Sequence, residues 1–235
     1  MAVSLPWFKP QDTFLAEQVE SAALRDTQAA AGLFLLFDTQ SNQASTNVTT
    51  TTVTISSVPP NAILVACCGC GSAQTDTVSG ATLGSFTNQA RISNNGQASL
   101  FTIQNTGGTL TNEVITYNSI ASGTWPGFTV YVFTGASTTF GTPATNTGAT
   151  AAFSVSVTAG VTGSQIVGVS YLFNTATVTP DGNTTGVLNT DNGNGDHIYT
   201  MKRTNLTTST GANPIGGTYS GAANWAAVGI EVRPA

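Results

Sequence analysis

Residues 151–160, AAFSVSVTAG, carry the clearest structural signal in the chain. Phe153, Val155 and Val157 alternate with residues that bear small hydroxyl groups or a methyl group. Because successive side chains of a β-strand point to opposite faces, this alternation predicts a strand with one buried apolar face and one exposed hydroxyl face.

Further strand-like runs lie on both sides of this segment, and Gly, Pro and Asn clusters separate them. These runs are TTTVTIS (50–56), NAILVACCGC (61–70), ASLFTIQ (98–104), NEVITYNS (112–119), GFTVYVFTG (127–135), SQIVGVSYLF (164–173), HIYTMKR (197–203) and NWAAVGIEVRP (224–234). No helical pattern follows residue 32, which excludes the helical crossovers of a parallel α/β sheet. Residues 46–235 are therefore predicted to form about eight to ten strands in an antiparallel, two-sheet β-sandwich of the jelly-roll kind.

Residues 1–45 differ from this pattern and are predicted to form an N-terminal arm. Two prolines, Pro6 and Pro10, favour an extended start. The segment FLAEQVESAALRD (14–26) then has the spacing of an amphipathic helix, which we expect to span about residues 12–31. Its apolar side and the aromatic residues before it are the candidate contacts with a neighbouring subunit or shell: Trp7, Phe8, Phe14, Leu15, Val19 and Ala22.

The surface is predicted to be almost uncharged. Only 7% of the residues are charged, against about 25% in ordinary soluble domains. Hydroxyl groups, amides and backbone must therefore cover the exterior. No cluster of Lys or Arg is present in the sequence, which argues against nucleic acid as a partner, because phosphate binding requires such clusters.

Segments for secretion or membrane insertion are not predicted. Residues 1–10 have neither a basic nor an apolar signal-peptide region. The longest apolar run, AAAGLFLLF at 29–37, is about half as long as a membrane helix requires. We therefore expect synthesis in a host cytoplasm and no membrane partner.

The three cysteines, Cys67, Cys68 and Cys70, lie within one predicted strand. Bridges between such close neighbours would be strained, and a zinc site would require a fourth ligand, for which His197 is the only histidine in the sequence. The prediction is three buried free thiols that pack as small apolar groups. No cofactor is predicted.

The segment 179–197 most resembles a binding site, because its oxygen-bearing residues follow calcium-loop spacing. The weak calcium candidates are Asp181, Asn183, Thr185, Asp191 and Asp196. The twelfth position of the loop, where a bidentate Glu is expected, is Asn192. The alternative, which we favour, is a turn-rich loop in which Asp, Asn and Gly serve backbone geometry.

Enzymatic readings are weak. The carboxylates beyond residue 40 are scattered over separate strands and loops, whereas a glycosidase needs two of them close together in a cleft. His197 has no serine in a nucleophile-elbow motif to act with. The protein is predicted not to be an enzyme.

Three segments, GTYSGAANWAAVGIEVRPA (217–235), NAILVA (61–66) and GFTVYVFTGA (127–136), resemble jelly-roll structural proteins of tailed phages and other prokaryotic viruses. The resemblance covers about residues 48–235 and implies a β-sandwich fold without catalytic residues. It implies a virion location and a role in a particle. Combined with the uncharged surface and the arm, it predicts a head decoration or minor capsid protein.

Such a protein would bind copies of itself, as a trimer or lattice, and other virion proteins through its arm. Like charges repel across every contact between identical copies, whereas hydroxyl and amide surfaces do not. A carbohydrate-binding or adhesin module, with calcium and exposed aromatic residues at its site, is the alternative. A glycan hydrolase is a third and weaker reading.

Overall fold

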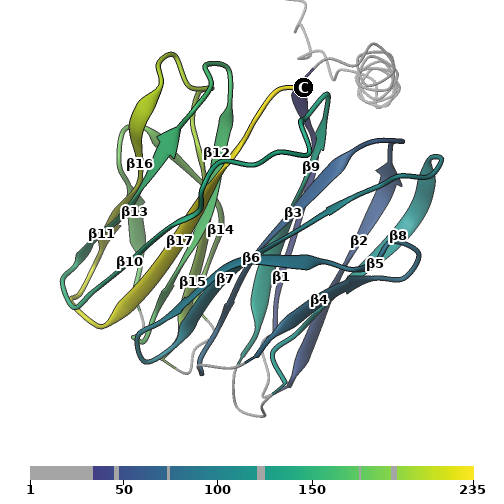
Figure 1. Ribbon diagram of the computed structural model, residues 1–235. Coiled ribbons are helices and arrows are strands. Elements are labelled where there is room, and N and C mark those ends of the chain that lie inside the picture. Colours follow the sequence, from purple (N-terminus) through teal and green to yellow (C-terminus); the bar gives the residue numbers. More distant parts are fainter. Residues whose placement is uncertain (1–33, 45–47, 73–74, 121–124, 175, 192–194) are drawn as a thin grey trace, which may run out of the picture.

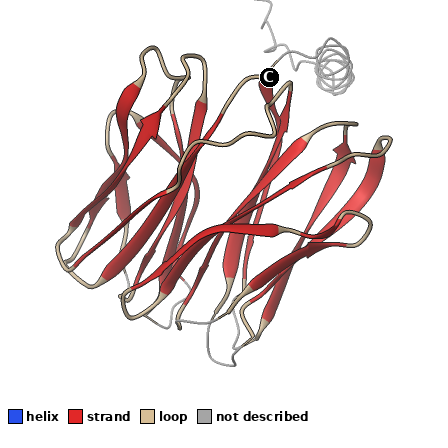
Figure 2. Ribbon diagram, in the orientation of Figure 1, coloured by secondary structure: helices blue, strands red, loops and turns tan. Residues whose placement is uncertain are grey.

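The computed structural model describes residues 34–44, 48–72, 75–120, 125–174, 176–191 and 195–235, and these residues form strands, turns and loops (Figures 1 and 2). The strands are β1 (Leu35–Gln43), β2 (Thr50–Val58), β3 (Ile63–Cys70), β4 (Thr77–Gly80), β5 (Gly84–Ser85), β6 (Thr87–Ser93), β7 (Gln97–Gln104), β8 (Leu110–Asn118), β9 (Gly127–Thr134), β10 (Ala144–Gly148), β11 (Ala152–Ala159), β12 (Gln165–Leu172), β13 (Val178–Pro180), β14 (Thr184–Asp191), β15 (His197–Arg203), β16 (Gly211–Tyr219) and β17 (Trp225–Val232). Within the described ranges, no helix is both long and apolar enough to span a membrane. The predicted helix at 12–31 and its contact residues lie outside the described residues.

The predicted all-β, antiparallel sandwich is confirmed, and the chain contains it twice. The first half has sheets β1-β9-β3-β7-β6 and β2-β8-β4-β5, which we call sheets A and B. The second half has sheets β10-β17-β12-β15-β14 and β11-β16-β13, which we call sheets D and E. The strand orders of the two halves are the same when β1–β4 are matched with β10–β13 and β6–β9 with β14–β17. Strand β5 has no counterpart among the described residues.

Each half has the nested pairing of a jelly roll, in which a long hairpin is wrapped into two sheets. In the first half β1 pairs with β9, β2 with β8, β3 with β7, and β4 with β5. In the second half β10 pairs with β17, β11 with β16, and β12 with β15. The expected count of strands and sheets was therefore too low, because residues 46–235 were read as one sandwich.

Two hydrogen-bonding devices recur at equivalent positions and support this duplication. The side-chain amide of Asn42 donates to the Thr52 carbonyl at 2.8 Å, and Asn146 donates to the Ser154 carbonyl at 2.8 Å. Each bond ties the first strand of a sandwich to the second strand, which belongs to the opposite sheet. The turn before β3 repeats before β12, since Asn61 and Gly163 both have a positive φ. Asn61 donates its N–H to the loop before β8, and Gly163 donates its N–H to the loop before β16.

The four sheets are stacked in the order B, A, D, E, with an apolar core between each pair of neighbours. Sheets A and D are covered on both faces, so β3, β9, β12 and β17 are buried along their whole length. Continuous apolar runs are what double-sided burial requires. Between sheets A and D the apolar contact includes one pair of hydroxyls, Thr129 and Thr200, whose oxygens are 2.5 Å apart.

Sheets A and D pack with their strands in reversed lateral order. β1 lies against β14, β6 lies against β10, and the equivalent strands β3 and β12 face each other at the centre. This is the arrangement of an isologous dimer with a two-fold axis along the strands. One chain thus contains a pseudo-symmetric pair of jelly rolls, joined by the linker at residues 135–143, whose Ala136 forms a bridge with Pro234.

The sandwich begins at Leu35, earlier than the predicted boundary at residue 46. β1 pairs with β9 over its whole length, with a bulge between Leu36 and Asp38. The polar second half of β1, Asp38–Gln43, lies at the edge of sheet A and is only partly buried. The run LFLLFDTQ (33–40) has the pattern of a first strand of the main body, but the polar stretch at 39–47 that follows it placed the predicted boundary later.

Candidate functional site

The calcium candidates do not form one site. The segment 179–197, read as a loop, consists largely of β14, and Asp181 and Asp191 lie at its two ends, roughly 24–34 Å apart for an extended strand of this length. Asp181 Oδ1 accepts the N–H of Asn183 at 3.2 Å and the hydroxyl of Thr184 at 2.6 Å, which fixes the turn into β14. The Thr185 hydroxyl contacts that of Thr204 on the neighbouring segment.

Asp196 contacts the hydroxyl of Tyr171 in the buried region where the two sandwiches meet. Burial and this contact raise the pKa of Tyr171. His197 is also buried, and its Nε2 lies 2.9 Å from Asn189 Oδ1. Burial lowers the pKa of His197 against the opposing effect of Asp191. Asp196 and His197 therefore connect neighbouring strands near their ends.

Asp76 is the centre of a buried polar cluster in the first sandwich. Its carboxylate accepts hydrogen bonds from Arg91 Nε at 2.7 Å and from the Tyr117 hydroxyl at 3.0 Å, and the Ser99 hydroxyl donates to it as well. Arg91 also donates to the Asp76 carbonyl at 2.9 Å. A buried carboxylate needs such a full set of donors, so the cluster fixes the loop before β4 to sheets A and B.

The three cysteines are free and buried, as predicted. Burial raises the pKa of Cys67 and of Cys68, and raises that of Cys70 to about 11. The thiols are therefore protonated at neutral pH and pack in the cores on both faces of β3. Among the described residues, no three His, Cys, Asp or Glu side chains are grouped as metal ligands.

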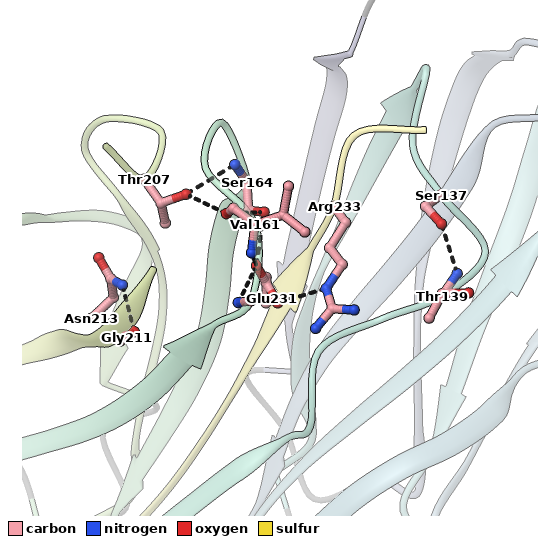
Figure 3. Close-up of polar contacts among 10 residues, drawn as sticks. Ser137, Thr139, Val161, Ser164, Thr207, Gly211, Asn213, Glu231 and Arg233 are labelled. Carbon is pink, nitrogen blue, oxygen red and sulfur yellow. Dashed lines mark hydrogen bonds and ion pairs between the residues drawn. The ribbon is translucent and has the colours of Figure 1, made fainter. Parts of the chain in front are cut away.

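In β17, alternation with Val228, Ile230 and Val232 would place Glu231 on the opposite, polar face of the strand, but its side chain is fully buried. Figure 3 shows it at the end of the second sandwich, where Oε1 accepts the N–H groups of Gly160 and Val161 at 2.9 and 3.1 Å and the Ser164 hydroxyl at 2.8 Å. Arg233 Nε donates to Oε2 at 2.8 Å. Burial acts to raise the pKa of Glu231, but these hydrogen bonds outweigh it and lower the pKa.

Glu113 has a comparable role in the first sandwich. It is buried in β8, and its Oε1 accepts the N–H groups of Thr82 and Leu83 at 2.8 and 3.0 Å in the turn between β4 and β5. Trp225 is also structural, since it is buried against Phe153 and donates its indole N–H to the Thr150 carbonyl. It is therefore not part of an exposed aromatic pair for stacking a sugar.

The outward faces of sheets B and E remain as the extended accessible surfaces. On sheet B, Thr52, Thr116, Ser79 and Ser85 stand opposite one another across four strands. The exposed side chains of β2 are Thr50, Thr52, Thr54 and Ser56. Within these strands the single charged residue, Glu113, points inward. We call this surface hydroxyl face B.

Sheet E has a similar outward surface, which we call hydroxyl face E. The exposed residues of β11 include Ser154, Ser156 and Thr158, and Thr218 stands opposite Thr179 on the neighbouring strands. The strands of sheet E contain no charged residue. The alternation in β11 thus predicted both its buried and its exposed face correctly.

The residues of the predicted arm contact, from Trp7 to Ala22, lie outside the described residues. A comparison of the chain with family models, with curated proteins and with solved structures finds no match.

Proposed function

We propose that this protein is a non-enzymatic structural protein of a virus particle. Its most specific form is a phage head decoration or minor capsid protein that associates with copies of itself and with other virion proteins. The observation that carries this proposal is the pair of uncharged hydroxyl faces, B and E, on opposite sides of a four-layer body.

The physical argument concerns contacts between identical copies. A charged face placed against a second copy brings like charges together, which costs several kcal/mol. Thr and Ser side chains instead exchange hydrogen bonds across a contact without net charge. Jelly rolls also occur in viral capsids, although this is an analogy of fold and not of site.

The arm adds the second part of the proposal. The predicted helix of the arm, at about residues 12–31, precedes Phe34 in the sequence. The Phe34 ring stacks on Phe133 of β9 with 5.9 Å between ring centroids. A partner that binds Trp7, Phe8, Phe14, Leu15, Val19 and Ala22 would therefore be connected to the rigid body through residues 23–33. The net negative charge of residues 1–40 favours a protein partner over packaged nucleic acid.

The test is sedimentation velocity of the full chain over a wide concentration range, with electron microscopy of any assemblies. We expect concentration-dependent self-association. The double variants Thr52→Lys/Thr54→Lys on face B and Ser154→Lys/Ser156→Lys on face E should weaken it at least about tenfold, because each contact then juxtaposes like charges. The matched control is Thr106→Lys/Thr208→Lys, which adds the same charge to exposed loops.

The full-length variant Leu15→Asp/Val19→Asp tests the arm without removing a strand, and we expect it to reduce assembly. A wild-type protein that stays monomeric at every concentration contradicts the proposal. Equal effects of the face variants and the loop control would contradict the role of the hydroxyl faces. A glycan-binding function is the second candidate, and one feature of the first sandwich favours it.

A further inference from the structure

A pocket of about 210 Å³ lies where the linker between the two sandwiches passes the end of sheet A. It is lined by Ile63 of β3 and by Thr102, Ile103 and Gln104 of β7. Thr87 of β6, Thr138 and Phe140 complete it, the last two from the linker. Ligand sites are frequent at such junctions between domains.

The lining combines apolar surface with neutral polar groups and has no ionisable side chain. Phe140 is half-buried and packs against the core between sheets A and D, which holds its ring in place. The Thr102 hydroxyl accepts a hydrogen bond from Gln89 Nε2 at 2.7 Å. In contrast, the side chains of Thr87, Gln104 and Thr138 make no hydrogen bond to other described residues, so their donors and acceptors are available to a ligand.

This chemistry selects among ligand classes. A charged ligand would lose its hydration without meeting an opposite charge in the pocket. A purely apolar ligand would remove water from the Thr and Gln groups without replacing its hydrogen bonds. A neutral sugar satisfies both requirements, because one face of its ring presents C–H groups while its hydroxyls donate and accept hydrogen bonds.

We propose that this junction pocket binds one residue of a neutral sugar. The apolar face of the sugar ring lies on Phe140, and the sugar hydroxyls form hydrogen bonds with Thr87, Gln104 and Thr138. The volume lies below the range of about 300–1,000 Å³ for sites of drug-sized ligands, which fits a single ring. This inference does not depend on the assembly role proposed above.

The pocket belongs to the first sandwich and breaks the pseudo-symmetry. Gln165 occupies the position of Ile63 in the second sandwich, as the pairings with Phe133 and Val232 show. Its amide is already engaged, since it donates to the carbonyls of Ile166 and Arg203 at 3.1 and 2.9 Å. One sugar per chain is therefore expected.

The test is ligand-observed NMR of the full chain with glucose, galactose, mannose and N-acetylglucosamine, each added separately. We expect saturation transfer to the ring protons of at least one of them, with a Kd of about 1 mM or weaker, as befits a few hydrogen bonds and one small apolar contact. Glucuronate, which is charged, should bind more weakly than glucose.

Variants locate the binding. Gln104→Leu and Thr138→Val should each weaken it by about two- to tenfold, the equivalent of one hydrogen bond. Phe140→Leu keeps an apolar side chain against the core and should weaken binding through loss of the flat ring. Thr208→Val in an exposed loop of the second sandwich is the matched control, and thermal unfolding checks that every variant is folded.

Two outcomes overturn the inference: no transfer to any of the four sugars at concentrations on the order of tens of millimolar, or transfer that none of the three pocket variants reduces. Self-association measured on the same variants should match that of the wild type, so failure of this inference is distinguishable from failure of the proposed assembly function.

Discussion

Replacing Glu231 by alanine removes four hydrogen bonds from one end of the second sandwich. The carboxylate accepts two backbone N–H groups from Gly160 and Val161, the hydroxyl of Ser164, and Nε of Arg233. Alanine leaves these donors without their acceptor. Since the turn at residues 160–161 is exposed, water replaces part of the loss, and we expect a cost of about 3 kcal/mol in the free energy of unfolding.

Glutamine at position 231 keeps the shape of the side chain and removes its charge. Its oxygen can keep the Gly160, Val161 and Ser164 bonds, so the change loses mainly the contact with Arg233, whose side chain is 25% exposed. Because ion pairs with an exposed partner are weak, we expect Glu231→Gln to cost about 1 kcal/mol. The alanine variant should therefore unfold at a temperature about 6–12 °C below the wild type, and the glutamine variant about 2–4 °C below it.

The assay is thermal and urea unfolding of the wild type and both variants, repeated from neutral to acid pH. The folded state lowers the pKa of Glu231 below its ordinary value of 4.5. Its contribution is therefore complete above that value and is lost as the pH falls through the lower, folded-state pKa. The difference between the wild type and Glu231→Gln should be constant near neutral pH and should close in acid. An alanine variant as stable as the glutamine variant would refute this reasoning.

Two further predictions concern matched positions and buried thiols. Asn42→Ala and Asn146→Ala should each lower the free energy of unfolding by about 1 kcal/mol, because each removes the equivalent hydrogen bond from a separate sandwich. The two effects should add in the double variant. Urea unfolding measures the single and double variants, and clearly unequal effects of the two single variants would argue against equivalent roles. Cys67, Cys68 and Cys70 should not react with Ellman's reagent in the native protein, since they are buried and their pKa values are raised, and all three should react in denaturant; rapid labelling of the native protein would contradict their burial.

The sequence predicted the class of the fold and the faces of its outer strands. The alternation in β11 is that of a strand covered on one face, and the structure places β11 in an outer sheet. The stretch 127–135 carried a second signal, because it is apolar on both faces, as a strand between two cores must be. Two such cores require more than two sheets, so this stretch by itself argues against a single two-sheet sandwich.

The duplication was not visible because the two halves share a pairing pattern and not their residues. β3 reads ILVACCGC and β12 reads QIVGVSYL, and both satisfy the same double-sided burial. For the candidate sites, spacing predicted one cluster of five oxygen-bearing residues, but β14 separates Asp181, Asn183 and Thr185 from Asp191 and Asp196. The burial of Glu231 does not follow from alternation, which assigns it to the face opposite Val228, Ile230 and Val232 without showing that sheet E covers that face.

The linker at residues 135–143 turns an arrangement typical of two separate molecules into an intramolecular one. Dilution cannot part the two jelly rolls, because the local concentration of each for the other is fixed by a short tether. In a true homodimer any substitution occurs on both sides of the axis, whereas here it occurs once. Each half is therefore free to specialise, so that a groove can develop on one jelly roll while the opposite one keeps a plain exterior.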